Sequence, residues 1–184
     1  MLSIIIPARD ESENLEQILN YFSEGLETID YEVILINDFS SDDTFEKGSK
    51  LFEGKQNFKI FNNKRKGLGG AINLGIEKCS GTKVSIMMAD LSDDVEDLKR
   101  YNNLIDQKNL DAVLGTRFSK GSRVIDYPFQ KLVLNRIFNF FVIIIFWNKY
   151  NDYTNAFKIY KNDVLKNLLP LVSESFNIFL EIPL

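Results

Sequence analysis

Residues 2–22 read LSIIIPARDESENLEQILNYF, and this stretch decides the class of fold. It opens with the apolar run Leu2 to Ile6, which favours a buried strand. After the turn at residues 7–11, apolar side chains recur at the 3.6-residue spacing of an amphipathic helix, at Leu15, Ile18, Leu19 and Phe22. The stretch therefore predicts a strand followed by a helix, the repeating unit of an α/β protein.

The same alternation repeats over the first 115 residues. Further β-rich apolar runs cover residues 31–36, 58–61, 84–88 and 112–114, and helices are predicted over 11–24, 42–53, 67–79 and 93–107. Asp42 and Asp93 are the predicted N-caps of the second and fourth helices. Near-continuous apolar strands between helices indicate a mostly parallel sheet covered on both faces. Because ligands of such sheets bind outside the carboxyl ends of the strands, the residues that follow each strand are the candidates for function.

The composition excludes several classes of function. The 184 residues include 22 Lys or Arg, 26 Asp or Glu and no His, and the net charge is −4. Catalytic triads, Cys-His nucleophiles and HExxH zinc sites all need imidazole, and the single Cys79 cannot form an internal disulfide. An acidic chain lacks the excess of Lys and Arg with which proteins bind the phosphates of nucleic acid, so nucleic acid is not an expected partner. We expect one globular domain, residues 1–184, whose chemistry uses carboxylates, Lys, Arg or backbone groups.

Polar turns follow the first three predicted strands. Glu11 either caps the first helix or contacts a ligand, and Asp38 either closes a local turn or accepts from a base or a ribose. The third turn, NKRKGLGG at residues 63–70, combines basic residues with glycines at a helix start, which suits a phosphate. The same glycines equally suit tight packing of a helix on a strand. A dinucleotide-binding oxidoreductase is disfavoured, because its glycine loop should follow the first strand, where this chain has PARDE.

Carboxylates and cations follow the fourth and fifth predicted strands. Asp90, with Ser92 two residues on, offers the oxygen ligands that a hard divalent cation prefers, although a capped helix explains the same residues. After the fifth strand, residues 115–136 contain five basic residues and one acid, namely Arg117, Lys120, Arg123, Lys131, Arg136 and Asp126. This segment is either a solvated charged face or a site for an anionic headgroup at a membrane surface.

A strongly apolar helix is predicted over residues 137–147. Its uninterrupted run from Phe140 to Trp147 is far shorter than the roughly 20 residues of a spanning helix, so it should lie in a core, against a partner or in a bilayer interface. No targeting segment precedes the first strand, which predicts a cytoplasmic protein, peripheral on the inner face of the cell membrane if the helix is interfacial. Residues 176–184 are still apolar, so we expect the natural protein to continue beyond them.

These motifs occur in the order found in one known family. They are SIIIPARDE at residues 3–11, INDFSSDDT at 36–44, the glycine segment 63–75, ADLS at 89–92, GTR at 115–117, DYTNAFK at 152–158 and residues 176–181. In this series the chain resembles family 2 glycosyltransferases of the GT-A fold, most closely the dolichyl- or polyprenyl-phosphate sugar transferases. The resemblance implies a Rossmann-like three-layer sandwich, with a nucleotide-sugar-binding half at residues 1–115 and an acceptor-side half at 116–184.

The resemblance also implies roles for individual residues. The residues implied to contact the nucleotide sugar are Pro7, Ala8, Arg9, Glu11, Ile36, Asp38, Lys66, Gly67, Met88, Ala89 and Asp90. The residues implied to bind a Mg²⁺ or Mn²⁺ ion are Asp90 and Ser92. The residues implied to bind the acceptor phosphate are Arg117, Arg123 and Lys131, and the implied catalytic residues are Asp90, Arg117, Asp152 and Glu181. Several positions depart from the family, with Arg9 in place of Tyr, Asn37 and Met88 each in place of Asp, Lys131 and Asn135 in place of Arg and Ser, and Ala156 in place of Gly. Met88 is the most consequential, because a thioether does not serve a hard cation as a carboxylate does.

The reaction implied by the resemblance moves a sugar from a UDP- or GDP-linked donor to a lipid phosphate, with inversion at the anomeric carbon. A phosphate monoester, with a second pKa of about 6, is already ionised near neutral pH and needs no catalytic base. Two alternatives stay open. A saccharide hydroxyl as acceptor would need a base, for which Asp152 and Glu181 are the candidates. A nucleotide-sugar-binding module without turnover is motivated by Met88, Asn37 and Arg9.

Overall fold

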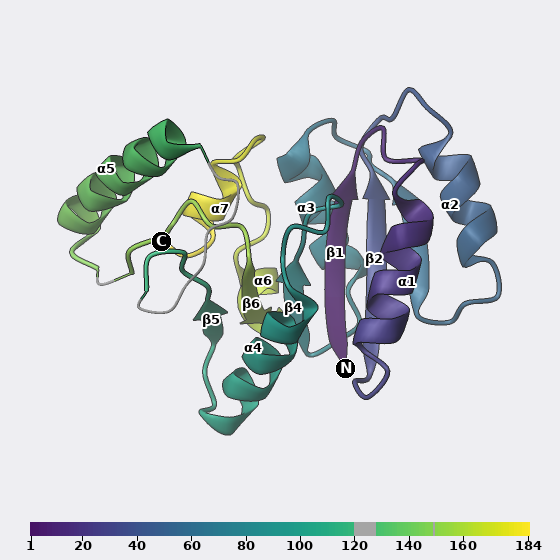
Figure 1. The fold of residues 1–184 in the computed structure, drawn as a ribbon, viewed down its shortest axis with the longest axis horizontal. Coiled ribbons are helices and arrows are strands. Elements are labelled where there is room, and N and C mark those ends of the chain that lie inside the picture. Colours follow the sequence, from purple (N-terminus) through teal and green to yellow (C-terminus); the bar gives the residue numbers. More distant parts are fainter. Residues whose placement is uncertain (120–127, 149) are drawn as a thin grey trace.

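A six-stranded sheet forms the centre of the molecule (Figure 1). The computed structural model describes residues 1–119, 128–148 and 150–184. The strands are β1 Leu2–Ala8, β2 Tyr31–Asn37, β3 Phe58–Asn62, β4 Lys83–Ile86, β5 Ala112–Leu114 and β6 Lys158–Lys161. They lie in the order β3-β2-β1-β4-β6-β5, and all five strands predicted from the sequence are among them.

Five strands of the sheet run in one direction, and β6 runs against its neighbours. β1 pairs in parallel with β2 and β4, and β2 pairs in parallel with β3. β6 lies between β4 and β5 and is antiparallel to both. The mostly parallel sheet is confirmed, but the sequence analysis did not predict β6. The four residues of β6, KIYK, begin and end with lysine, so no apolar run marks them as a strand.

Helices cover both faces of the sheet. α1 Leu15–Gly25, α2 Thr44–Phe52 and α4 Val95–Gln107 pack on one face, and α3 Leu68–Lys78, α6 Asn162–Asn167 and α7 Ile178–Glu181 pack on the other. The alternation of side chains along β1 divides the core, because Ile4 and Ile6 join the first layer and Ile5 joins the second. The result is the three-layer sandwich that the sequence predicts.

Three helices, α1, α2 and α4, begin two or more residues later than their sequence patterns predict. α1 begins at Leu15 and not at residue 11, and the residues before it form a separate turn in which Asn14 N donates to Glu11 O at 2.9 Å. The backbone N–H of Glu11 donates to the hydroxyl of Thr44 and joins this turn to the next loop. α4 begins after Asp94, whose carboxylate accepts a hydrogen bond from the first turn. Asp94 is therefore its N-cap, and the prediction of Asp93 was wrong by one residue.

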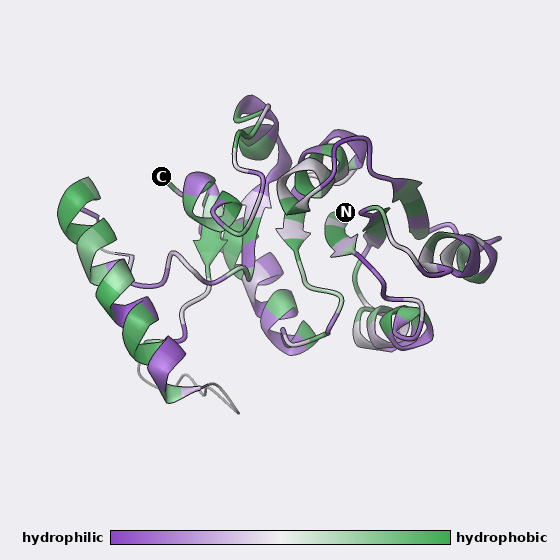
Figure 2. Cartoon of the chain, turned by 90° about the horizontal axis from the view of Figure 1, so that it is seen from above, coloured by the Kyte–Doolittle hydropathy of each residue, from purple (hydrophilic) through white to green (hydrophobic). Residues whose placement is uncertain are grey.

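The helix α5, Phe129–Phe146, stands apart from the rest of the chain (Figures 1 and 2). It is longer than the predicted helix at 137–147, and it ends where Trp147 takes a left-handed conformation with a φ of 51°. Asn139 and Val142 are its buried residues, and among the described residues neither core layer includes a side chain of α5. With 18 residues and a mean hydropathy of 1.6, α5 is long and apolar enough to cross a membrane by length and composition alone. The expectation that this segment is too short to cross a membrane rested on the uninterrupted apolar run at residues 140–147 alone. It is wrong for the helix as a whole, which begins at Phe129.

Candidate active site

Side-chain hydrogen bonds join the loops that follow β1 and β2. Asp10 Oδ1 accepts from the backbone N–H of Ser41 at 2.6 Å and from the Ser41 hydroxyl at 2.9 Å, and these bonds lower the pKa of the Asp10 carboxyl. Asp42 Oδ2 accepts from Ser12 N at 3.1 Å. Asp42 therefore bridges the loops and is not the N-cap of α2, a position that falls at Asp43. The two loops form one hydrogen-bonded unit at the carboxyl edge of the sheet.

Three residues at this edge have a left-handed backbone conformation without being glycine. They are Asp10, Phe39 and Leu91, with φ of 57°, 56° and 55°, and they follow β1, β2 and β4 respectively. Such conformations are strained for bulky side chains and persist where the surrounding structure holds them, as at ligand sites. The strain therefore marks the same edge at which the strand order predicts a ligand.

Asp38, predicted to contact the base or the ribose, is buried and holds the loop after β3. Its carboxylate accepts from Gly67 N at 2.9 and 3.1 Å and from Asn63 Nδ2 at 2.7 Å. Gly67 has a φ of 111°, a conformation that favours glycine. Asp38 therefore organises the glycine loop, and its contact with a nucleotide stays a prediction.

The glycines of this loop pack closely against another segment. Gly69 N donates to Glu174 O at 3.1 Å, and a Cβ on Gly69 would lie only 1.8 Å from Ser173 O. Of the two interpretations that the sequence leaves open for these glycines, close packing is the one that this geometry supports. Lys66 is exposed on the same loop and stays a predicted contact of the nucleotide, as does Gly67.

The loop after β4 carries the predicted cation ligands. Asp90 is exposed, its Oδ1 accepts from Ser92 N at 3.0 Å, and its other oxygen bonds to no described residue. Burial, together with the nearby charge of Asp90, raises the pKa of Asp93 to about 6. Among the described residues, no group of three or more His, Cys, Asp or Glu could hold a metal ion. One open carboxylate and one hydroxyl fit a hard cation whose other ligands are substrate phosphates and water, and Met88 offers no carboxylate two residues before Asp90.

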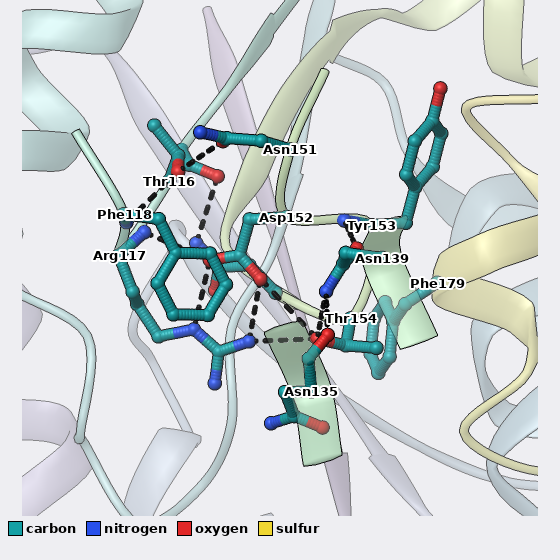
Figure 3. Close-up of polar contacts among 12 residues, drawn as sticks. Thr116, Arg117, Phe118, Asn135, Asn139, Asn151, Asp152, Tyr153, Thr154 and Phe179 are labelled. Atoms are coloured by element: carbon teal, nitrogen blue, oxygen red, sulfur yellow. Dashed lines mark hydrogen bonds and ion pairs between the residues drawn. The ribbon is translucent and has the colours of Figure 1, made fainter. Parts of the chain in front are cut away.

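Arg117 and Asp152 form the second part of the site (Figure 3). Asp152 is fully buried and accepts from Arg117 Nε at 2.9 Å, from Nη2 at 2.6 Å and from the Arg117 backbone N–H at 2.8 Å. This two-pronged contact fixes the plane of the guanidinium group. The Arg117 side chain is 22% exposed, so an oriented cationic group reaches the surface where the acceptor phosphate is predicted.

Side-chain contacts of Asn139 and Arg136 attach α5 to the surroundings of this ion pair. Asn139 Oδ1 accepts from the backbone N–H of Tyr153, the residue after Asp152, at 2.6 Å. The Phe118 ring is contacted by two guanidinium groups, that of Arg117 at 5.6 Å and that of Arg136, on α5, at 5.0 Å. The apolar helix is therefore connected to the oriented arginine through its few polar residues.

The two candidates for a general base are both engaged in hydrogen bonds. Asp152 is paired with Arg117 as described, and Glu181 accepts from Val172 N and Ser173 N, both at 2.8 Å. Burial raises the pKa of Glu181, but the hydrogen bonds from Ser173 and Val172 outweigh it and leave that pKa lowered. A carboxylate held as Glu181 is held is a weak proton acceptor. Both oxygens of each carboxylate accept hydrogen bonds, and the catalytic roles of Asp152 and Glu181 stay predictions.

The other predicted site residues fall on strands, on the surface or outside the described part. Pro7, Ala8 and Ile36 are buried residues of β1 and β2, in a register that sets Pro7 opposite Ile36. Ala89 is buried, whereas Arg9 on the β1 loop and Lys131 on α5 are exposed. Arg123 lies outside the described residues. The structure thus brings the predicted nucleotide contacts to one edge of the sheet, and places the described acceptor candidates, Arg117 and Lys131, after β5 and on α5.

Sequence analysis assigned no role to Lys158, which the structure places beside the ion pair. Lys158 is only 1% exposed, and its Nζ donates to Tyr153 O at 3.0 Å and to Phe179 O at 2.7 Å. The signal in the sequence that could have identified Lys158 was its position as a single charged residue between the apolar residues Phe157 and Ile159. Such a charge usually points to solvent at the edge of a sheet, and only the position of β6 between two strands buries it.

A mixed α/β sheet with its polar loops at the carboxyl edge is the architecture of nucleotide-dependent glycosyltransferases of the GT-A type. Residues 3–169 match the family described as Glycosyl transferase family 2, and the chain belongs to this family.

Three known proteins illustrate the similarity. The dolichol-phosphate mannosyltransferase of Pyrococcus furiosus is 31% identical over 135 residues, which cover 73% of this chain and 38% of that protein. Glucosyl-3-phosphoglycerate synthase from Mycobacterium tuberculosis, solved with Mn²⁺, UDP and glucosyl-3-phosphoglycerate, aligns with a TM-score of 0.67 at 15% identity over 100% of this chain and 63% of that one. S. aureus TarS in complex with UDP aligns with a TM-score of 0.63 at 22% identity, over 94% of this chain and 50% of TarS. The chain spans 38% of the length of its Pyrococcus relative.

Proposed function

We propose that this chain transfers a sugar from a nucleoside diphosphate sugar to a polyprenyl or dolichyl phosphate, with inversion at the anomeric carbon. The observation that carries the proposal is an oriented guanidinium group, Arg117 held by buried Asp152, connected to an exposed apolar helix. A lipid phosphate has the two matching parts, an anionic head and an apolar chain. The similarity to a dolichol-phosphate mannosyltransferase supports the same acceptor class.

In the proposed reaction, an oxygen of the acceptor phosphate attacks the anomeric carbon from the side opposite the diphosphate. The bond from that carbon to the diphosphate breaks, and the nucleoside diphosphate leaves with the electron pair. Because the acceptor is already ionised near neutral pH, no residue has to remove a proton. This agrees with the engaged carboxylates of Asp152 and Glu181. Arg117 contributes a fixed charge that needs no reorganisation when the anions bind.

The donor nucleotide is proposed to bind at the carboxyl edge of β1, β2 and β4. Arg9, Glu11 and Asp38 lie on the loops there, and the structural neighbours solved with UDP support a nucleotide as the ligand. Asp90 and Ser92 are the residues that would hold a Mg²⁺ or Mn²⁺ ion. Such an ion would neutralise charge on the departing diphosphate. With Met88 in place of a carboxylate, we expect its affinity to depend largely on the bound diphosphate.

The helix α5 is proposed to lie in the interface of an anionic membrane, on its cytoplasmic side. Most of its apolar side chains are exposed, with Phe129 at 75%, Ile145 at 71% and the following Trp147 at 92%, whereas Val142 is buried. Lys131 and Arg136 are exposed on the same helix and suit anionic headgroups. This arrangement would bring the head of a membrane-embedded acceptor to Arg117.

The test is transfer of radiolabelled sugar from UDP- and GDP-sugars to polyprenyl phosphate in anionic vesicles. We expect transfer by the unmodified chain and a loss of about 100-fold or more in Asp90→Ala. Asp97→Ala, which removes an exposed carboxylate from α4, is the matched control and should stay within about twofold. Nucleotide binding without transfer to any acceptor would replace the proposal with a binding module. Transfer to a saccharide but not to the lipid phosphate would instead support a hydroxyl acceptor.

A further inference from the structure

Lys158 is a buried amine that joins two segments of the acceptor side. Its acceptors are the carbonyl of Tyr153, which directly follows Asp152, and the carbonyl of Phe179 in α7. The Tyr150 ring lies 5.8 Å from the same Nζ. Lys158 is therefore enclosed by the turn that holds the Arg117–Asp152 pair.

The charges around this amine do not balance. Of the groups that act on it, Asp152 is the negative charge and Arg117 is a second positive charge. Tyr150 and Tyr160 have raised pKa values because they are buried, so they add no charge near neutral pH. Glu181 lies on α7, but its carboxylate is bonded to Val172 N and Ser173 N. With Lys158 protonated, Lys158, Arg117 and Asp152 together carry one excess positive charge, which favours the binding of an anion beside Arg117.

The hydrogen bonds of Lys158 do not require its charge. A neutral amine keeps two N–H donors, which is the number that the two carbonyls need. Burial and the charge of Arg117, partly opposed by Asp152, lower the pKa of Lys158 to about 7. Gain or loss of the proton therefore changes the charge of the site near neutral pH while the contacts stay in place.

We propose that Lys158 is a positioning residue and the buried second cation of the anion site at Arg117, and that it takes up a proton from solvent when a dianion binds there. The inference rests on the proposed acceptor site. It predicts that the site binds dianions more weakly as the pH rises, although Arg117 stays charged throughout.

Inorganic sulfate is the probe, because it stays dianionic from pH 6 to 9, whereas phosphate itself titrates in this range. Its affinity is measured at pH 6.5, 7.5 and 8.5 from the NMR signals of the Arg117 and Thr154 amides in the ¹⁵N-labelled chain. For the unmodified chain we expect the affinity to fall above pH 7, by up to about tenfold per pH unit. Lys158→Arg keeps the charge and cannot titrate, so its affinity should be independent of pH. Lys158→Met should bind sulfate weakly at every pH.

Lys161→Met is the matched control, because it removes a partly exposed lysine from the same strand and should behave as the unmodified chain. If Lys158→Met keeps the original affinity and pH dependence, or if sulfate does not perturb the Arg117 and Thr154 amides at any pH, the inference is wrong. If Lys158→Met does not fold, the inference is tested by comparing the unmodified chain with Lys158→Arg. An equal pH dependence of the sulfate affinity in these two proteins would refute the proton uptake by Lys158. Sulfate binding needs no sugar transfer, so a chain with the expected pH dependence but no transferase activity would sustain the inference and contradict the proposed function.

Discussion

The proposed donor side, at the carboxyl edge of β1, β2 and β4, and the proposed acceptor side, around Arg117 and α5, are stabilised in different ways. On the donor side, loops on a parallel sheet are joined by several neutral and charge-assisted hydrogen bonds, such as those of Asp10 and Asp42. On the acceptor side, a buried ion pair between Arg117 and Asp152 stands at the centre of the contacts between two segments, and the neighbouring helix α5 is exposed. Neutral hydrogen bonds, such as that from Tyr150 to Gly115 O, join the same two segments. The difference teaches that the donor-side loops are held without a buried ion pair, whereas the acceptor side places a buried charge pair beside an apolar helix that the core does not cover.

The comparison predicts the largest loss of stability from Arg117→Met. This change leaves the fully buried Asp152 without its cation, and we expect the free energy of unfolding to fall by about 3–5 kcal/mol. Urea unfolding at pH 7 measures it. Arg100→Met, which breaks an exposed pair with Asp97, is the control and should change stability by less than about 1 kcal/mol. Equal effects of the two variants would mean that the acceptor side does not depend on its ion pair.

The donor half has its own buried carboxylate, Glu32, at the opposite end of the sheet. Burial raises its pKa, but hydrogen bonds from Lys59, Ser3 and Ser80 outweigh this and lower the pKa to about 2, from an ordinary value of 4.5. A carboxyl whose pKa is lower in the folded chain than in the unfolded chain stabilises the fold at every pH above its unfolded pKa. This stabilisation is lost as the pH falls toward the folded pKa. We therefore expect a loss of up to about 3 kcal/mol between pH 4.5 and 2.

Urea unfolding at pH 6, 4 and 3 tests the Glu32 prediction. In Glu32→Gln the corresponding part of the pH dependence should be absent, because the amide does not titrate. The prediction fails if the variant and the unmodified chain lose stability in parallel.

Gly69 lies where the donor half meets the C-terminal segment. In Gly69→Ala the new Cβ would lie 1.8 Å from Ser173 O, a backbone atom, so we expect a loss of about 1–3 kcal/mol and a lower melting temperature. Gly48→Ala is the control, because its Cβ would meet Ile60 Cδ1, at 2.7 Å, which is the tip of a flexible side chain. A loss in Gly69→Ala no larger than in this control would show that the junction is loose.

The smallest effect on stability is expected at the end of α5. Trp147 is 92% exposed, so Trp147→Ser should change the free energy of unfolding by less than about 0.5 kcal/mol. Trp147 is the single tryptophan of the chain, and its fluorescence therefore reports on this helix alone. If α5 binds an anionic membrane, the emission should shift to shorter wavelength when anionic vesicles are added. An unchanged spectrum would contradict the interfacial position.

Short-range patterns were sufficient for much of the fold. The five strands, the helices between them and the polar turns at the strand ends follow from runs and spacings within about a dozen residues. Where the prediction failed, the deciding contact was distant. The turn before α1 is bonded through Glu11 to Thr44, and β6, which no apolar run marks, is placed by its pairing with β4 and β5.

The sequence by itself determined the alternation of strands and helices, the order of the site loops and the family, because each is written in neighbouring residues. Only the tertiary structure decided that the glycines at the start of α3 pack against residues 173–174, that Asp152 orients Arg117 and that Lys158 is buried beside them. These contacts join parts of the chain that lie far apart in sequence. Whether such side chains meet depends on how the whole sheet is assembled, which no local pattern specifies.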